Sequence, residues 1–304
     1  MNKIKIFNIR KCTAIFMAML MMLLSLSYTG NTTNALNTRR QYYIYNAKTG
    51  VKTGEYYLDP VPALNNSRTI IGDNDERVID WTKSGVVKLI TYMGNICKLG
   101  SGFVVSDHVI ATAAHCVYGA KISEIILFDN NGNITLRATP VEYHMPYTYV
   151  SSNQENERFD YALITVKEDL SDYAYFDLGV PLDSFASKHS AVSITGFPTT
   201  IGKPSEEKTV NTTTQHMMYT GNGTVKNIDH SDLMYYDCDT IGGNSGGPVY
   251  IKESFNGKTY YTVIAIHAHG IHNGVVGHNC GNHGACMTTD LIHFYTGNNT
   301  NINW

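Results

Sequence analysis

Short apolar segments bounded by turn-forming residues dominate the chain from Val86 onward. Clusters of Gly, Asn, Asp and Ser separate these segments, which is the pattern of successive β-strands. The expected strands cover residues 86–92, 102–106, 109–111, 122–128, 162–166, 191–195, 217–219, 233–236, 249–251 and 260–266. Helical periodicity is weak except near residues 290–295. The pattern therefore predicts an all-β fold with a C-terminal helix.

The first 35 residues differ from the rest of the chain. Lys and Arg side chains come first, an apolar stretch rich in Met and Leu covers residues 13–27, and small residues follow at 33–35. This order is typical of a secretory signal peptide, and the apolar stretch is short for a membrane span. A retained N-terminal anchor is the alternative. We expect residues 1–35 to be a signal peptide, and the mature protein to be secreted, extracellular and free of the membrane.

Charge is distributed unevenly along the chain, whose formal net charge is −3. Residues 1–68 hold nine Lys or Arg and two acidic residues, which leaves 14 basic and 24 acidic residues, a net of −10, over 69–304. An acidic surface repels phosphate backbones, so we expect no nucleic-acid partner. It also repels acidic substrates at long range, so any preference for them must come from a local site.

Three segments carry candidate catalytic residues. His115 lies in Ala-Ala-His-Cys, Asp160 in Phe-Asp-Tyr-Ala, and Ser245 in Gly-Gly-Asn-Ser-Gly-Gly-Pro. Serine alone is a poor nucleophile near neutral pH, so a histidine must take its proton and a buried carboxylate must hold that histidine in the right tautomer. One such segment arises easily by chance, but three in the order His, Asp, Ser indicate a catalytic triad.

These segments resemble those of the chymotrypsin-like serine proteases. Over residues 69–295 the resemblance implies two six-stranded antiparallel β-barrels, with His115 and Asp160 in the first, Ser245 in the second and the active site in the cleft between them. It also implies an oxyanion hole formed by the backbone N–H groups of Gly243 and Ser245. A plain glycine-rich turn is the alternative for this segment, but such a turn requires no matching His and Asp.

A second serine motif also fits the residues around Ser245. Gly243-Asn244-Ser245-Gly246-Gly247 matches the G-x-S-x-G nucleophile elbow, which requires a helix after the serine and the order Ser, Asp, His. Pro248 follows almost at once, the next residues have the pattern of a strand, and only about 60 residues remain, so we reject the elbow.

The segment after Arg68 resembles the mature start of bacterial glutamyl endopeptidases: a hydrophobic pair, a short Asn/Asp-rich stretch and then Arg. We therefore expect residues 36–68 to be a propeptide removed by an activating protease, Thr69 or Ile70 to be the mature N-terminus, and 69–304 to be the peptidase domain. An ordinary linker is the alternative. Asn244 stands where trypsin-like zymogens carry an aspartate that binds the new N-terminal ammonium group. Activation through that salt bridge is therefore not available here.

The same resemblance implies a specificity pocket. In glutamyl endopeptidases a Thr or Ser and a His at the places of Thr240 and His267 bind the substrate's glutamate carboxylate, and a hydroxyl and an imidazole are suitable donors. The sequence thus predicts a serine endopeptidase that cleaves peptides after Glu, and after Asp more slowly. Cleavage should then vary with pH near the titration of the pocket histidine.

Two alternatives concern this pocket. Asp239 stands where trypsin-like enzymes carry the aspartate of the pocket base, which would favour Lys or Arg. Ala268 and His269 replace the Trp-Gly of the staphylococcal type, so the pocket wall is expected to differ. A narrow, toxin-like specificity also stays open, since exfoliative toxins share this subfamily.

Six cysteines are present, and Cys12 is lost with the signal peptide. The family resemblance implies a disulfide between Cys97 and Cys116. Of the other three cysteines, one must stay free or pair between chains.

A His- and Cys-rich segment follows the pocket. His278, Cys280, His283 and Cys286 have the spacing of metal ligands, so a secreted metal-binding protein is the second class of function. A histidine-bearing loop with a disulfide or free thiols is the simpler interpretation. We expect no cofactor, no metal and a monomer whose partners are protein or peptide substrates.

Overall fold

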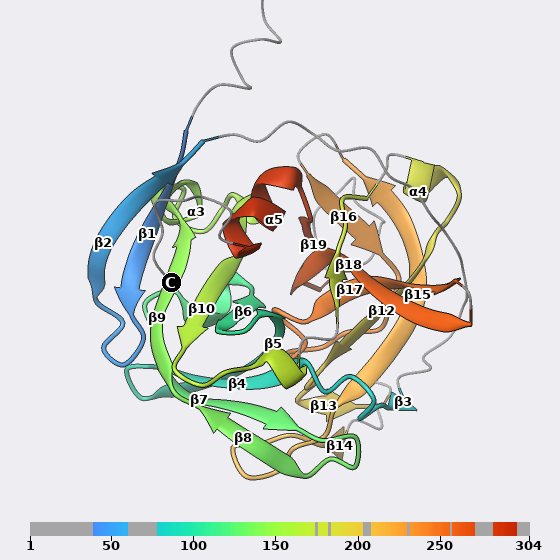
Figure 1. The fold of residues 1–304 in the computed structure, drawn as a ribbon, viewed down its shortest axis with the longest axis horizontal. Coiled ribbons are helices and arrows are strands. Elements are labelled where there is room, and N and C mark those ends of the chain that lie inside the picture. Colours follow the sequence, from blue (N-terminus) through green and yellow to red (C-terminus); the bar gives the residue numbers. More distant parts are fainter. Residues whose placement is uncertain are drawn as a thin grey trace, which may run out of the picture.

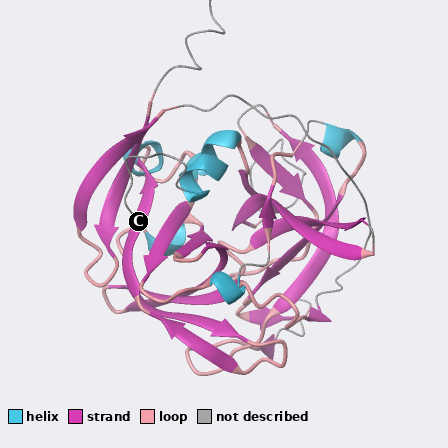
Figure 2. Ribbon diagram, in the orientation of Figure 1, coloured by secondary structure: helices cyan, strands magenta, loops and turns pink. Residues whose placement is uncertain are grey.

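The structure, a computed structural model, describes residues 39–59, 78–173, 176–181, 184–202, 208–229, 232–255, 257–270 and 282–296. Strands account for most of this part of the chain, and the helices are short (Figures 1 and 2). The expected all-β class and C-terminal helix are confirmed. No helix in these ranges is both long and apolar enough to cross a membrane. The proposed signal peptide and the proposed mature N-terminus lie outside the described residues.

Nine strands form the first sheet, in the order β2-β1-β9-β10-β6-β5-β4-β7-β8. Their bounds are β1 Arg40–Asn46, β2 Lys52–Leu58, β4 Val86–Met93, β5 Ile96–Ser106, β6 Val109–Thr112, β7 Lys121–Phe128, β8 Ile134–Ala138, β9 Pro140–Pro146 and β10 Ala162–Val166. Each pairing along this order is antiparallel. Burial is highest in β6, in β4 from Val86 to Thr91 and in β5 from Gly100 to Val104, where these strands form the centre of the sheet.

The second sheet closes into a six-stranded barrel. Its strands are β12 Ala191–Gly196, β15 Tyr219–Ile228, β16 Leu233–Tyr236, β17 Pro248–Phe255, β18 Lys258–His269 and β19 Asn282–Cys286. The ring runs β12-β15-β16-β19-β18-β17 and returns to β12, with every pair antiparallel. Such closure leaves no free edge among these strands.

Short elements complete the fold. The remaining strands are β3 Val78–Ile79, β11 Asp177–Leu178, β13 Thr200–Ile201 and β14 Lys208–Thr209, and the helices are α2 Ala114–Val117, α3 Tyr147–Ser151, η1 Glu157–Phe159, η2 Ser171–Tyr173, α4 Ser184–Ser187 and α5 Thr289–Thr296. In α5, Leu291, Phe294 and Tyr295 are buried. This helix therefore contributes apolar side chains to the largest core cluster.

The β1–β2 hairpin was not expected, since the sequence pattern begins its strands at Val86. Figure 1 shows the hairpin in blue beside β9. The pattern missed it because tyrosines and polar residues occupy most of its positions, and only the neighbouring strand makes it half-buried. The pattern also missed β8, β9, β19 and most of β15, and it placed a strand over 217–219 where β15 begins only at Tyr219.

The two sheets are joined by polar contacts as well as by packing. Lys88 of β4 is fully buried, and its Nζ donates to the carbonyl oxygens of Thr212 (2.5 Å) and Gln215 (2.7 Å), which precede β15. Burial lowers the pKa of Lys88 to about 8. Carbonyl acceptors offset much of the cost of removing an ammonium group from water. Lys88 therefore ties the first sheet to the second through main-chain atoms.

The expected disulfide between Cys97 and Cys116 is wrong, because both cysteines are free. Cys97 is exposed at the start of β5, whereas Cys116 is buried in α2. The sulfur of Cys116 instead faces Gly100, where it lies 3.0 Å from the position a Cβ would take. Gly100 is three residues further along the strand, so Cys97 is out of reach. Cys238 and Cys286 are also free and buried, and Cys280 lies outside the described residues.

Candidate active site

Strand pairing brings His115 and Asp160 together. His115 lies in α2 directly after β6, and Asp160 lies directly before β10; Thr112 of β6 pairs with Ala162 of β10. The main-chain N–H of His115 donates to Asp160 Oδ1 (2.8 Å), and His115 Nδ1 lies 2.6 Å from Asp160 Oδ2. Because a carboxylate only accepts, Nδ1 carries the proton and Nε2 is left as the basic nitrogen.

The pair shifts the pKa of both members. Burial alone would raise the pKa of Asp160, but the charge of His115 and hydrogen bonds from His115 and His269 outweigh it and hold this pKa well below its usual range. Burial alone would lower the pKa of His115, but Asp160 outweighs it and raises the pKa well above 6.5. The geometry is that of a carboxylate that orients an imidazole and stabilises its cation.

Ser245 lies in a tight turn before β17, and glycines make that turn possible. Gly243 has φ +99° and Gly246 has φ +84°. A Cβ at Gly243 would collide with the carbonyl oxygen of Phe197, and one at Gly246 with that of Ser101. Glycine is the residue that adopts positive φ without strain. The turn is therefore specified by its glycines.

Ser101 of β5 fixes this turn against the first sheet. Its N–H donates to the carbonyl oxygen of Ser245 (2.8 Å), and its Oγ donates to that of Gly243 (2.7 Å). With those carbonyls engaged, the N–H groups of Gly243 and Ser245 donate no backbone hydrogen bond to any described residue. Two unused N–H groups beside a serine are the arrangement that an oxyanion requires.

The hydroxyl of Ser245 donates to the carbonyl oxygen of Ala268 (3.3 Å). Within the described residues, this hydroxyl forms no hydrogen bond with the His115 ring. Catalytic hydrogen bonds are often long or misaligned before substrate binds. Both side chains line one cavity of about 630 Å³. Its wall is formed by His115, Tyr149, Gln154, Asp239, Thr240, Ile241, Gly242, Ser245, His267, Ala268, His269, Gly270 and Asn282. The candidate residues on β18 and those near Ser245 thus meet in one cavity, and Asp160 lies buried behind His115.

His267 is buried in the cavity wall and bonded to Tyr236. The phenol oxygen of Tyr236 lies 2.6 Å from His267 Nδ1. Burial raises the pKa of Tyr236 well above 10, so the phenol keeps its proton and donates it. Nδ1 therefore accepts, and the proton of the neutral imidazole lies on Nε2, the nitrogen available to a ligand.

The expected titration of His267 is not supported. Burial, followed by the charges of His115, His283 and His269, lowers the pKa of His267 to about 3. The ring is therefore neutral throughout the range in which a histidine usually titrates. It is therefore a hydrogen-bond donor of constant charge. No motif pointed to Tyr236, because this tyrosine has the pattern of an ordinary residue of a buried strand.

Thr240 adds a second polar atom to the cavity wall. Its Oγ1 is buried and has no hydrogen-bond partner in the described structure. A buried hydroxyl without a partner costs free energy unless a ligand supplies one. Asp239 lines the same cavity. The residues of both sequence-based alternatives therefore line one pocket: Thr240 with His267 for the first alternative, and Asp239 for the second.

His269 has a position that sequence reasoning missed. It was expected in the pocket wall, and it does line the cavity. Its Nε2, however, also lies 3.2 Å from Asp160 Oδ2. The two histidines at positions 267 and 269 of β18 were the available signal, but spacing alone could not show which residues they contact.

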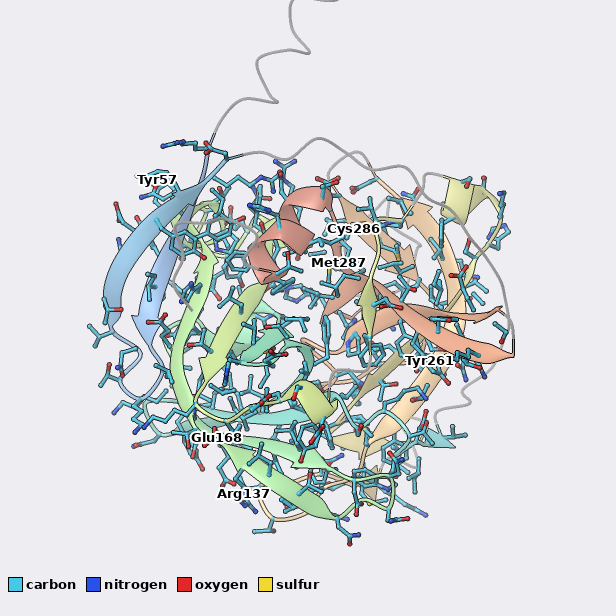
Figure 3. The ribbon with its side chains drawn as sticks, viewed as in Figure 1. Tyr57, Arg137, Glu168, Tyr261, Cys286 and Met287 are labelled. Carbon is cyan, nitrogen blue, oxygen red and sulfur yellow. The ribbon has the colours of Figure 1, made fainter. Side chains whose placement is uncertain are left out.

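The metal-ligand reading can be tested on two of its four residues. His278 and Cys280 lie outside the described residues. His283 bonds Glu157 (2.9 Å), and Cys286, labelled in Figure 3, is buried in the second core cluster. These two lie three positions apart on β19, and side chains an odd number of positions apart point to opposite faces. They therefore do not converge on one ion.

Another group of possible ligands lies at the site itself. One atom each of His115, Asp160 and His269 lies within 4.8 Å of the others. The separation of 2.6 Å between His115 Nδ1 and Asp160 Oδ2 is that of a charge-assisted hydrogen bond. Two ligands held about 2.0–2.1 Å from one zinc ion in a tetrahedron lie farther apart than this. The group fits a hydrogen-bonded site better than a metal centre.

Residues 100–254 match the model of the trypsin-like peptidase domain, which covers half of the chain. The chain therefore belongs to this family. It is similar to the glutamyl endopeptidase of Bacillus licheniformis, with 23% identity over 225 residues, 71% of this chain and 65% of that protein. It is also similar to melanization protease 1 of Drosophila melanogaster, with 26% identity over 227 residues, 64% of this chain and 54% of that protein. The chain thus spans less than two thirds of each relative.

Solved structures share the fold. A Glu endopeptidase structure in complex with MPD aligns with a TM-score of 0.55 and 18% identity, covering 75% of this chain and 99% of that one. The protease Anisep from Arthrobacter nicotinovorans aligns with a TM-score of 0.52 and 18% identity, covering 72% and 98%. At this identity the likeness concerns the fold alone.

The pKa shifts predict a single acidic limb in the pH profile of hydrolysis. The base form of His115 is lost as pH falls through its raised pKa, so kcat/KM should drop below a midpoint above 6.5. His267, with a pKa of about 3, should add no second step between about pH 5 and 8. The measurement is kcat/KM of a fluorogenic peptide against pH. A midpoint below 6.5 would contradict the assignment of His115.

Proposed function

We propose that the chain is a serine endopeptidase that hydrolyses peptide bonds with His115, Asp160 and Ser245. The observation that carries this proposal is the arrangement of an imidazole 2.6 Å from a fully buried carboxylate, in one cavity with a serine on a tight turn between positive-φ glycines. Family membership supports the reaction class.

The residues fit a two-step acyl transfer. His115 Nε2 takes the proton of Ser245 as its Oγ attacks the carbonyl carbon, and the peptide oxygen becomes an anion held by the N–H groups of Gly243 and Ser245. His115 then gives the proton to the departing amine, which leaves an acyl-serine. Water hydrolyses this ester with His115 again as the base. No cofactor enters any step.

Replacement of the proposed nucleophile tests the class. Ser245→Ala should lower kcat by about 10⁴–10⁶-fold, because the residues of a triad act as a unit. The matched control is Ser193→Ala, a half-buried position of β12 outside the cavity. Circular dichroism should show both variants folded. Activity of Ser245→Ala within tenfold of the wild type would refute the proposal.

The proposed specificity is cleavage after Glu, with Asp cut more slowly. His267 presents an Nε2–H donor because Tyr236 occupies Nδ1, and Thr240 Oγ1 has no partner, so a carboxylate in this pocket would find two donors. Since His267 is neutral, it binds the carboxylate by hydrogen bonds and fixed dipoles. Asp is one methylene shorter, a difference of about 1–3 kcal/mol, so it should be disfavoured and still cleaved. The similarity to a glutamyl endopeptidase supports this choice over the trypsin-like one.

Variants of the pocket histidine test the specificity. His267→Ala should lower kcat/KM for a Glu peptide by about tenfold to a hundredfold and leave a Leu peptide within about threefold, because only the carboxylate loses a donor. His293→Ala in α5, outside the cavity, is the control. Cleavage sites are mapped in a denatured peptide library. A profile dominated by Lys or Arg would reject the proposal in favour of Asp239 as the pocket base.

We also propose that the protein is exported and processed. A signal peptide over 1–35, a propeptide over 36–68 and a peptidase domain over 69–304 account for the composition of the three parts. The partners would be protein or peptide substrates and an activating protease, and the enzyme would act as an extracellular monomer.

A further inference from the structure

Asp160 is contacted by two histidines. Its Oδ2 lies 2.6 Å from His115 Nδ1 and 3.2 Å from His269 Nε2, and its Oδ1 accepts the main-chain N–H of His115. Asp160 is fully buried and His269 is partly buried. Because the carboxylate offers only acceptors, the nitrogen of His269 that faces it must carry a proton.

The ring of His269 is held from both sides. It stacks on the His115 ring with centroids 4.9 Å apart and planes 29° apart, and it lies 5.5 Å from the His283 ring. His283 is in turn bonded by Glu157, which belongs to η1 immediately before Asp160. The β18–β19 register shifts between His267 and His269, and a shift of this kind redirects a side chain. His269 is thus held between the carboxylate of Asp160 on one side and His283 on the other.

We propose that His269 is a positioning residue that holds the carboxylate of Asp160 toward His115 by a second hydrogen bond while its ring limits the tilt of His115. This inference rests on the proposed peptidase function. Removing the donor leaves the charge of Asp160 less dispersed, so His115 should stay protonated to higher pH and less of it should be available as the free base at a given pH. The charged or titratable groups that face this cluster are His115, Asp160, Cys116, Glu157, His283, His267 and Tyr149.

Two substitutions separate the hydrogen bond from packing. His269→Phe keeps an aromatic ring on His115 but has no donor, whereas His269→Gln keeps a donor. In His269→Phe, kcat should fall about tenfold with KM within about twofold, and the acidic limb of kcat/KM should move to higher pH. In His269→Gln most of kcat and the original limb should return.

The titration of His115 is also followed through its Nδ1 proton by NMR. The two proteins compared are the Ser245→Ala variant and the double variant Ser245→Ala/His269→Phe. This measurement needs no peptidase activity. If the titration shifts but the protein with Ser245 intact hydrolyses no peptide, the proposed function is refuted while the role of the His269–Asp160 contact is retained. An unchanged kcat and titration in His269→Phe would overturn the inference. Equal losses in Phe and Gln variants with an unmoved limb would also overturn it.

A different observation concerns the β1–β2 hairpin, which lies within the expected propeptide. β1 pairs with β9 from Tyr42 opposite Pro146 to Asn46 opposite Glu142. At its end, Ala47 donates to the carbonyl of Val141 (3.1 Å), and its own carbonyl accepts from Ile122 in β7 (2.8 Å). The segment thus bridges two strands of the first sheet.

Side chains of the hairpin are part of the core. Tyr42 is fully buried and stacks on Phe294 of α5 with centroids 4.4 Å apart, and its hydroxyl lies 3.4 Å from that of Tyr161, the residue after Asp160. Tyr45 stacks on Tyr143 (5.0 Å), and Arg40 forms an ion pair with Asp290 (2.5 Å). Aromatic rings of this size bury large areas, so their removal would leave a cavity.

We infer that residues 40–58 stay bound to the peptidase domain, as a second noncovalent chain, when the polypeptide is cut between Asp59 and Val78. The test places a site for a sequence-specific protease over 62–67 in the Ser245→Ala protein. After complete cleavage, native mass spectrometry should show both pieces in one species. Tyr42→Ala should weaken retention at least about a hundredfold. Tyr57→Ala, 51% exposed at the outer edge in Figure 3, should leave it unchanged. Separation of the unsubstituted pieces under native conditions would overturn the inference.

Discussion

The buried carboxylate of Asp160 is the constraint on which the site depends. A carboxylate removed from water is costly unless hydrogen bonds and an opposite charge replace its hydration. Here the replacement comes from the main chain and ring of His115 and from His269. The same contacts that make the burial tolerable also orient the imidazole, so stability and the proposed chemistry share one set of atoms. The first sheet supplies this pair through the β6–β10 register, and β18 supplies the additional histidine.

The second requirement is that the two sheets hold the turn of Ser245 at a fixed position relative to His115. Ser101 performs this from the first sheet by bonding the carbonyls of Gly243 and Ser245, and the N–H of Gly246 bonds back to His267 on β18. The serine turn is therefore held between β18, which carries His267, and β5, which pairs with the strand β6 that leads to His115. Lys88 joins the sheets again at a distance from the cavity. Polar contacts of this kind fix orientation more narrowly than apolar packing, because they have preferred directions.

Electrostatics divides the histidines of the cavity between two roles. His115 faces a carboxylate, which raises its pKa, whereas His267 is buried against a phenol and other imidazoles, which lowers its pKa to about 3. One ring is thus suited to exchange a proton and the other to donate a hydrogen bond without changing charge. Identical side chains diverge because burial penalises a charge that has no partner and a neighbouring carboxylate favours it.

The sequence by itself determined the all-β class, the C-terminal helix and the local motifs around His115, Asp160 and Ser245. It could do so because turn glycines, short apolar runs and such motifs are encoded over a few neighbouring positions. It could not place the tyrosine-rich hairpin, whose burial exists only beside β9 and α5. It also predicted a disulfide to Cys116, whose sulfur faces Gly100 and not Cys97, and a titrating His267 that burial keeps neutral, and it did not reveal the contact of His269 with Asp160. These features join residues far apart in the chain. Only the tertiary structure decided them, since distance and desolvation are properties of the folded molecule.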